Sequence, residues 1–329
     1  MRDWILLAAE MTLLIVATNV SYGQNERPLT APDSVILSGW QYGNLFVTTP
    51  EGSFPVNSPP GSSDQGYFVL PALSPNGDLI AWGLTLPDIS GRAKCNPRTL
   101  GCAVPGLVQH RSTMGVYSLR DKTWNTYGDF CELGAGSAAF SPDGMKVAFE
   151  AKIDTGDRGC YSDDVTETLL ILDLVSGQFT WVPDTVGVMA NARISWSPDG
   201  KYIAAQFGAW APSSSIVLIE VGSWIQKQIA EGWDPSWSPK GDLIAYETDE
   251  GTKCVVARPD GTEAKLILHV GGDSQIPMGV VWSPEEKTLW LSEEEFSGKT
   301  RVASVDLATG KVKKMPKYTP SVFGWVQNH

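Results

Sequence analysis

The sequence contains few of the residues on which most catalytic sites depend. Among its 329 residues there are three histidines, His110, His269 and His329, and no two cysteines in a CxxC spacing. Positive charge is also scarce, because 25 Lys and Arg stand against 37 Asp and Glu, a formal charge of −12. Nucleic acid and anionic lipid attract proteins with an excess of positive charge. We therefore expect no nucleic-acid partner. We also expect no cofactor.

Motifs of nucleotide-binding and hydrolytic enzymes are missing as well. No GxxxxGK[ST] or GxGxxG run occurs between an expected strand and an expected helix. The segment 39–43 has the glycine spacing of a nucleophile elbow, but Gln41 occupies the position of the serine. We expect no catalytic residue.

The N-terminus has the pattern of an export signal. An apolar stretch, residues 4–20, follows Met1-Arg2-Asp3 and precedes Ser21-Tyr22-Gly23. A positive start, an apolar centre and small residues at −3 and −1 are typical of a signal peptide. Residues 1–23 are therefore expected to be a signal peptide, or an uncleaved membrane anchor, followed by a linker at 24–33. After this leader, no apolar run is long enough to cross a bilayer.

Five cysteines fit an oxidising compartment, secreted or periplasmic. Cys95 and Cys102 flank a short loop, and Cys131 and Cys160 both lie in loop-like sequence. Disulfides between these loop cysteines are favoured over a zinc site, because the histidines are scattered. Cys254 lies within an apolar run, Lys253–Ala257, and is expected to be a buried free thiol.

One segment recurs five times and organises the chain. Its centre is Ser-Pro-Asp-Gly or a variant, and its prolines are separated by steps of 67, 56, 41 and 45 residues. Proline at the first corner and glycine at a position of positive φ make this a tight turn. Apolar residues alternate on both sides of it, as in a β-hairpin. The five copies are 72–82, 139–149, 195–205, 236–246 and 281–291.

Each copy is followed by a second pair of expected strands, so the unit has four strands. Four strands at this period indicate the blades of a β-propeller. Segments 35–37, 44–48 and 53–56 resemble the last three strands of a blade, and 321–325 resembles a first strand. The sequence therefore predicts one all-β, six-bladed propeller over residues 34–329, whose sixth blade joins the two ends of the chain.

The S-P-D-G-K-x-I-A pattern resembles the TolB-like, WD-repeat-like β-propeller family. Five copies spread over the chain carry this resemblance, for example Ser197–Ala204. Similar blades form the gating propeller of prolyl-oligopeptidase-type peptidases. In TolB an α/β domain precedes the propeller, whereas here about ten residues separate the leader from the first strand. The resemblance implies a propeller alone, so TolB's role in the Tol–Pal envelope system does not follow from it.

Tryptophans recur just before the turn, at Trp196, Trp237 and Trp282. Repetition at one structural position predicts packing between blades. Trp210 differs because it lies in an expected loop, where it can stack on a sugar or peptide or cover the neighbouring blade.

Two enlarged connections mark one face of the expected propeller. In an antiparallel blade, the loops between the second and third strands (B–C) and those between blades (D–A) emerge on the same face. The long steps place a basic insert at 84–114 and an acidic insert at 152–167 there. Bridges Cys95–Cys102 and Cys131–Cys160 would brace both. Binding residues expected on this face are Arg92, Lys94, Arg98, His110, Arg111, Arg158 and Tyr161, with Trp210.

The acidic insert has two further interpretations. Its carboxylates, Asp154, Asp157, Asp163 and Asp164, can hold Ca²⁺, although they lack the regular ligand spacing of an EF-hand. A solvated acidic loop is the simpler interpretation of these carboxylates. As an alternative to a binding face, the acidic and basic inserts can merely neutralise each other across adjacent blades.

The sequence thus predicts an exported, non-catalytic binding or scaffold propeller. Its expected partner is an envelope or extracellular protein, peptide or glycan that meets the B–C/D–A face. The alternative is a hydrolase or lyase that uses carboxylates or a bound metal in the central channel. A relative of the Tol–Pal system, which would bind an envelope lipoprotein, is a third possibility.

Overall fold

The computed structural model describes residues 34–39, 45–49, 52–56, 71–86, 111–130, 132–133, 138–154, 165–183, 185, 193–208, 214–248, 253–269, 275–295, 300–314 and 321–327. These ranges form 25 β-strands and contain no helix. Within them, then, no helical segment has the length and apolar character that crossing a membrane requires. The expected leader and linker lie outside the described residues.

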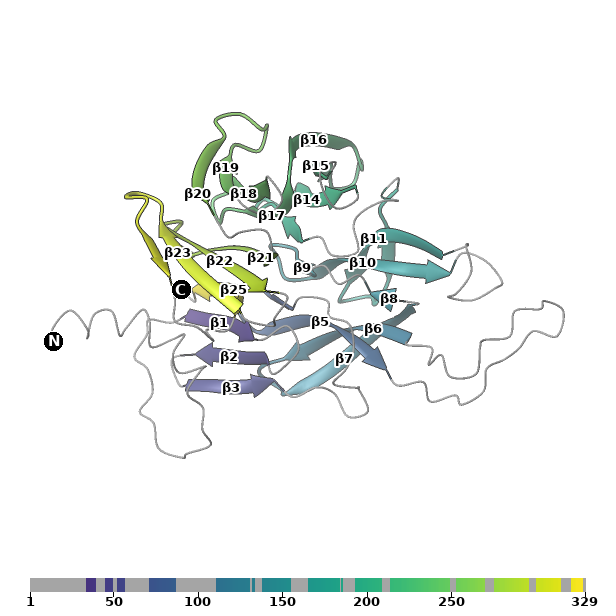
Figure 1. Cartoon of the computed structure of the whole chain (residues 1–329). Coiled ribbons are helices and arrows are strands. Elements are labelled where there is room, and N and C mark those ends of the chain that lie inside the picture. The colour runs from purple at the N-terminus through teal and green to yellow at the C-terminus, as the bar shows by residue number, and fades with distance from the viewer. Residues whose placement is uncertain are drawn as a thin grey trace, which may run out of the picture.

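The strands form six antiparallel sheets, or blades, which Figure 1 shows fanned around a common centre. From the inside outwards, blade 1 contains β4 (Ala72–Leu73), β5 (Leu79–Leu86), β6 (Arg111–Ser118) and β7 (Thr123–Phe130). In blade 2, β8 (Glu132–Leu133) and β9 (Ala139–Phe140) both pair with β10 (Lys146–Asp154), followed by β11 (Val165–Asp173) and β12 (Phe179–Trp181). Blade 3 contains β13 (Ile194–Trp196), β14 (Tyr202–Phe207), β15 (Ser215–Glu220) and β16 (Gln226–Glu231).

The remaining blades complete the ring. Blade 4 contains β17 (Trp233–Trp237), β18 (Ile244–Thr248), β19 (Lys253–Ala257) and β20 (Lys265–His269). Blade 5 contains β21 (Gln275–Trp282), β22 (Thr288–Glu295), β23 (Thr300–Asp306) and β24 (Val312–Lys314). Blade 6 contains β25 (Ser321–Gln327), β1 (Ser34–Gly39), β2 (Leu45–Thr49) and β3 (Gly52–Val56).

Blade 6 joins the two ends of the chain, as the sequence predicts. Strand β25 pairs antiparallel with β1, with Ile36 opposite Trp325 and Ser34 opposite Gln327. In Figure 1 the yellow β25 lies beside the purple β1. Each innermost strand contacts the innermost strand of the next blade, and β25 contacts both β21 and β4. The six-bladed propeller is therefore closed, and the predicted fold is confirmed.

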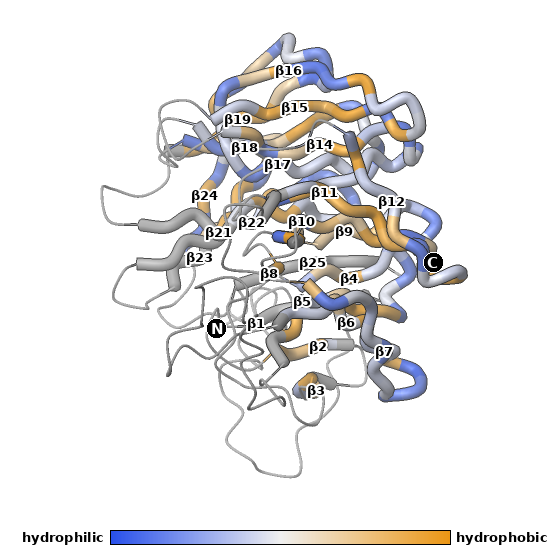
Figure 2. The backbone as a smooth tube through the Cα atoms, turned by 90° about the vertical axis from the view of Figure 1, so that its right-hand side faces the viewer, coloured by the Kyte–Doolittle hydropathy of each residue, from blue (hydrophilic) through white to orange (hydrophobic). Residues whose placement is uncertain are grey.

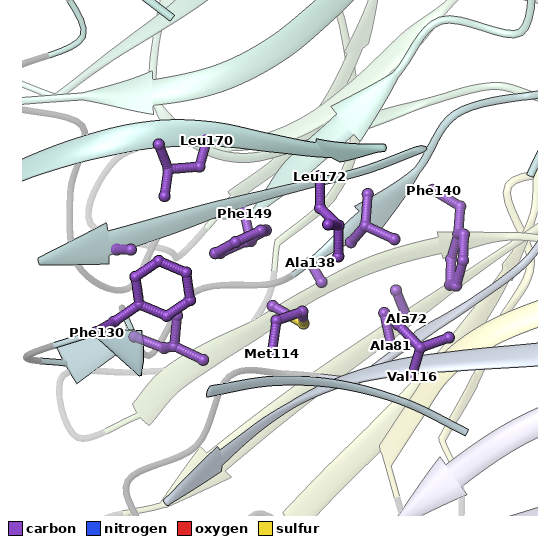
Figure 3. Packing of buried hydrophobic residues seen from close by; sticks show 13 residues of the cluster. Ala72, Ala81, Met114, Val116, Phe130, Ala138, Phe140, Phe149, Leu170 and Leu172 are labelled. Atoms are coloured by element: carbon purple, nitrogen blue, oxygen red, sulfur yellow. The ribbon is translucent and has the colours of Figure 1, made fainter. Parts of the chain in front are cut away.

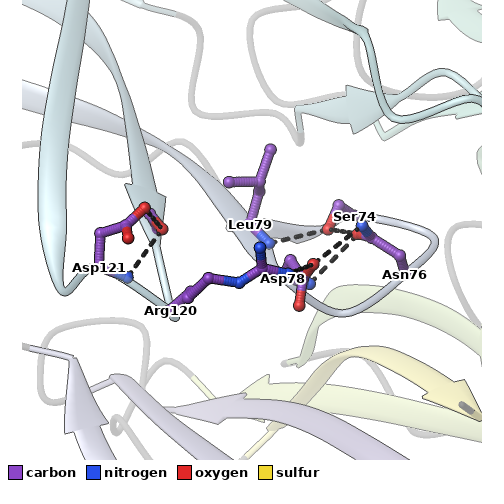
Figure 4. Close-up of polar contacts among 7 residues, drawn as sticks. Ser74, Asn76, Asp78, Leu79, Arg120 and Asp121 are labelled. Atoms are coloured by element: carbon purple, nitrogen blue, oxygen red, sulfur yellow. Dashed lines mark hydrogen bonds and ion pairs between the residues drawn. The ribbon is translucent and has the colours of Figure 1, made fainter.

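The repeated turn has the geometry that its residues favour. In blade 1, Ser74 Oγ donates to Asn76 Oδ1 (2.7 Å) and accepts the N–H of Leu79 (2.9 Å), as Figure 4 shows. The N–H of Gly77 donates to the Ser74 carbonyl, and its φ of 75° is a conformation that suits glycine. Outside the turn, Arg120 forms an exposed ion pair with Asp78 at 3.2 Å. The serine thus closes the turn from within, and this fixes the register of the hairpin that follows.

The turn of blade 5 departs from this pattern in an informative way. Glu286 stands where the other copies have glycine, and its φ is 56°. Its carboxylate accepts the backbone N–H of Lys240 at 2.5 Å and lies 2.9 Å from Lys240 Nζ. Lys240 belongs to the turn of blade 4, so the backbone strain at Glu286 is offset by a contact between blades.

Apolar side chains pack mainly between neighbouring blades. Figure 3 shows one such cluster, in which Met114 of blade 1 and Phe149 and Leu172 of blade 2 are fully buried. Phe130 and Phe149 meet edge to face with ring centroids 5.6 Å apart. The strands of a blade also differ in polarity. In Figure 2, β14 and β15 of blade 3 are largely apolar, whereas the outer strand β16 is more polar. Blades are thus held together by burial at their interfaces.

The ends of the two enlarged connections correct one expectation. Residues 84–86, 111–114, 152–154 and 165–167 were expected to belong to inserts, but they continue the strands, with Leu86 opposite Arg111 and Asp154 opposite Val165. These stretches carry apolar and β-branched residues that favour strands. Arg111 and Asp154 therefore stand at the ends of ladders. The tips of both inserts, 87–110 and 155–164, lie outside the described residues.

We predict that Phe149→Ala destabilises the propeller by about 3–5 kcal/mol, because it leaves a cavity between blades 1 and 2. Phe149 is fully buried, whereas Phe54 on the outer strand β3 is 50% exposed. Phe54→Ala is therefore the matched control and should change the free energy of unfolding far less. Urea titration followed by tryptophan fluorescence measures both, and equal losses would contradict the inter-blade role of Phe149.

Candidate functional site

The innermost strands enclose a central channel of about 360 Å³. Most of the residues that line it are apolar, several of them prolines, but polar atoms make up about half of the exposed wall. Among the described residues that line it, Arg193 is the only charged one. The others include Leu73, Phe140, Ile194, Trp196, Trp237, Val281 and Trp282, and the motif prolines Pro75, Pro142, Pro198 and Pro239.

The recurring tryptophans are buried between blades, as predicted, and two of them form a hydrogen bond to the preceding blade. Trp196 Nε1 donates to the Ala139 carbonyl of blade 2 at 3.1 Å. Trp282 Nε1 donates to the Ser236 carbonyl of blade 4 at 3.0 Å. Trp237 is equally buried, but its Nε1 finds no hydrogen-bond partner within the described ranges. The repeated position is therefore structural, with one indole N–H that the described part of the channel wall leaves unsatisfied.

A buried polar cluster interrupts the apolar wall. It consists of Arg193, just before β13 of blade 3, Asp234 in β17 of blade 4, and Glu247 in β18 of blade 4, all less than 9% exposed. Asp234 Oδ1 accepts the backbone N–H of Arg193 at 3.2 Å. A β-bulge between Trp233 and Ser236 brings Asp234 into this position, where its φ is 51°. A positive φ at a buried aspartate marks a site whose surroundings hold a strained backbone.

Burial dominates the ionisation of this cluster. Desolvation raises the pKa of Asp234 to about 6, although the charge of Arg193 and its backbone N–H oppose the rise. Desolvation also lowers the pKa of Arg193, while the charges of Asp234 and Glu247 oppose that fall. Asp234 thus changes its charge near neutral pH, which is unusual for an aspartate.

Glycine 279 makes room for the arginine. Its φ is 87°, and it lies at a bulge of β21 in blade 5. A Cβ built at Gly279 would collide with the Nε, Cδ and Cζ atoms of Arg193. The Arg193 side chain therefore extends from blade 3 to the backbone of blade 5.

Arg193, Asp234 and Gly279 share one position in three successive blades, four residues before the motif serine. This cluster was not predicted from the sequence. An alignment of the repeats on the motif serine would have shown an arginine, an aspartate and a glycine at this position in blades 3, 4 and 5. The burial and the bulges that bring these positions together are visible only in the structure.

Cys254 is a buried free thiol, as predicted. Desolvation raises the pKa of its thiol, and the nearby charge of Glu247 acts in the same direction. The cysteine therefore stays protonated and unreactive at neutral pH.

Most of the predicted binding residues lie outside the described part of the chain. This holds for Arg92, Lys94, Arg98, His110, Arg158, Tyr161, Trp210, Asp157, Asp163 and Asp164, and for Cys95, Cys102, Cys131 and Cys160. Arg111 and Asp154 stand at the ends of the β5–β6 and β10–β11 hairpins. Across the described ranges, no three His, Cys, Asp or Glu residues are grouped so that they could hold a metal ion. The binding residues, the Ca²⁺ site and the disulfides stay predictions.

Comparison with known proteins supports the fold. No model of a protein family matches the chain. TolB from Acinetobacter baumannii is similar over 89% of this chain and 66% of its own, with a TM-score of 0.62 at 17% identity. A chain of the nidogen/laminin complex is similar over 89% and 97%, with a TM-score of 0.60 at 12% identity.

In fold, this chain is similar to TolB. Oligogalacturonate lyase in complex with manganese is also similar, over 88% of this chain and 80% of its own, with a TM-score of 0.54 at 12% identity. Among curated proteins, HIR1 from Kluyveromyces lactis is 26% identical over 114 residues. The match covers 33% of this chain and 13% of HIR1, and the chain spans just under two thirds of the TolB chain. These likenesses establish a propeller fold that serves in several kinds of protein.

We predict that Trp196→Phe costs about 1 kcal/mol more than Trp237→Phe, because only the first removes a hydrogen bond between blades. Both changes delete a similar volume from similarly buried sites. The difference between the two free energies of unfolding therefore isolates the hydrogen bond. Equal costs in denaturant titrations would show that the indole N–H of Trp196 contributes nothing measurable.

Proposed function

We propose that this protein is an exported, non-catalytic propeller that binds or scaffolds an envelope or extracellular protein, peptide or glycan through its B–C/D–A face. The support is the unequal length of the hairpins on that face. Strands β5 and β6 have 8 residues each and β10 and β11 have 9 each, against 6 in β14 and β15 and 5 in β18 and β19. In blade 5, β22 and β23 have 8 and 7 residues.

Two of the long hairpins, β5–β6 and β10–β11, belong to adjacent blades. Past the buried Ala151, β10 continues for three residues to Asp154, which corresponds to roughly 10 Å at about 3.3 Å per residue. The short strand β8 pairs with this extension, with Leu133 opposite Ala151 and Glu132 opposite Lys152. A third strand stiffens the projecting hairpin, so the acidic insert emerges from a rigid base. Scaffolded loops of this kind are where proteins commonly bind partners.

The sequence of the two tips gives the face its chemistry. Basic residues cluster in 92–111 and acidic ones in 154–164, so a partner would meet both signs of charge on neighbouring blades. Such a surface favours a polar partner oriented by its own charge pattern.

Two experiments test this proposal. The first is pull-down from the native envelope with three proteins: wild type, Arg92→Ala/Lys94→Ala/Arg98→Ala, and the control Lys227→Ala/Lys265→Ala/Lys314→Ala. The control residues are exposed lysines of the outer strands β16, β20 and β24. We expect the loop variant alone to lose its specific partner by at least tenfold. Retention of the same partner by the loop variant, or by a chain lacking 92–104, would refute the face assignment.

The second experiment concerns export. N-terminal sequencing of the mature protein should begin near Gln24 if residues 1–23 are a cleaved signal peptide. A retained Met1 in the membrane fraction would indicate an anchor, and a retained Met1 in the cytosol would refute export.

A second candidate function is a lyase or hydrolase centred on the channel. Its support is the likeness to oligogalacturonate lyase together with the raised pKa of Asp234 beside the channel. Turnover of an oligosaccharide that Asp234→Asn abolishes, with folding intact, would favour this candidate over the binding protein.

A further inference from the structure

Of the three residues in the buried polar cluster, one lines the channel. Arg193 lines the channel, whereas neither Asp234 nor Glu247 does. Asp234 approaches from blade 4 and accepts the Arg193 N–H, and the guanidinium lies against Gly279 of blade 5. A ligand in the channel would therefore meet the arginine first and the carboxylates only behind it.

The backbone on both sides is shaped for this arrangement. Asp234 has a φ of 51° at one bulge, and Gly279 has a φ of 87° at another. A non-glycine residue at positive φ beside a buried charged group at a cavity points to a functional use, and the glycine provides the space that the arginine needs. Around the arginine, the channel offers the indoles Trp196, Trp237 and Trp282, which suit an apolar or ring-shaped body.

Charge balance limits what can bind there. Adding an anion to a buried cluster is unfavourable unless a compensating charge accompanies it. Among the residues whose side chains the structure describes, Glu247 of β18 faces the pair, and Cys254 of β19 lies beside Glu247. Lys253 stands one register position further out, opposite Thr248, and Gly279 of β21 lies against the arginine. Cys254 is already protonated, and Asp234 is the acid whose pKa, about 6, allows it to take up a proton near neutrality.

We propose that Arg193 binds the carboxylate of a small ligand in the channel and that Asp234 takes up one proton when this happens. The ligand carboxylate comes to lie beside the guanidinium, and a proton moves from solvent to Asp234, whose Oδ1 accepts the backbone N–H of Arg193. One negative charge and one proton are added together, so the net charge of the cluster stays the same. The inference goes beyond the proposed binding function, because it concerns a ligand of the channel and needs no residue of the loop face.

Linkage then sets the pH dependence. Above the pKa of free Asp234 each binding event takes up one proton, so the affinity should fall about tenfold for each pH unit above 6. Below that pH Asp234 is already protonated, and the affinity should be nearly constant until the ligand itself is protonated.

Isothermal titration of the full chain with 3-phenylpropionate, and with the neutral 3-phenylpropionamide, tests the proposal without any variant. We expect the carboxylate to bind at least tenfold more tightly than the amide at pH 6, with about one proton taken up at pH 7.5 in buffers of different ionisation enthalpy. Equal affinity for the two compounds, or carboxylate binding without proton uptake, would overturn the proposal.

Variants then assign the groups. Asp234→Asn, which preserves the side-chain shape, should bind 3-phenylpropionate with an affinity that no longer depends on pH between 6 and 8. Arg193→Gln should lose the preference for the carboxylate over the amide, and the exposed Lys227→Gln should behave as wild type. Unchanged pH dependence in a folded Asp234→Asn would also overturn the proposal. Since Arg92→Ala/Lys94→Ala/Arg98→Ala should leave this titration intact, failure of the loop-face proposal is distinguishable from failure here.

Discussion

The pairing of β25 with β1 is the constraint on which the rest of the structure depends. Five blades in a row would leave the inner strands of blade 1 and blade 5 without a common neighbour. Blade 6 fills this gap, because β25 contacts β21 on one side and β4 on the other. The channel is therefore enclosed by six inner strands, and the edges that an open array would expose are paired. Every statement about a channel wall presupposes this closure.

The sequence predicted the parts of the fold that depend on local conformation. Pro198 and Gly200 restrict a four-residue turn, and the apolar residues beside them define a hairpin whose faces are read directly from alternation. Closure was predictable because three strand-like segments at one end and one at the other complete a blade. The ends of the strands could not be predicted in the same way. Residues 84–86 and 152–154 continue their strands only because a partner strand pairs with them.

The polar cluster escaped prediction for a different physical reason. Arg193 and Asp234 are 41 residues apart, and their contact requires a bulge at Trp233 that shifts the register of β17 on β18. Aspartate tolerates a positive φ better than most residues, but the sequence does not show that Asp234 adopts a φ of 51°, because this conformation goes with a bulge between two strands. The requirement for glycine at position 279 could not be predicted locally either. A Cβ there would collide with Arg193, which belongs to a blade two positions away.

Stability alone gives little reason for such a cluster. A buried ion pair is often no more stabilising than apolar residues of the same volume, because desolvation of both charges offsets their attraction. A non-glycine residue at positive φ adds a cost of about 1–3 kcal/mol. Apolar side chains line the same channel directly beside Arg193 and Gly279, at Ile194 and Val280. The arginine, its strained partner and the glycine beside it are thus better explained by contact with a ligand than by the needs of folding.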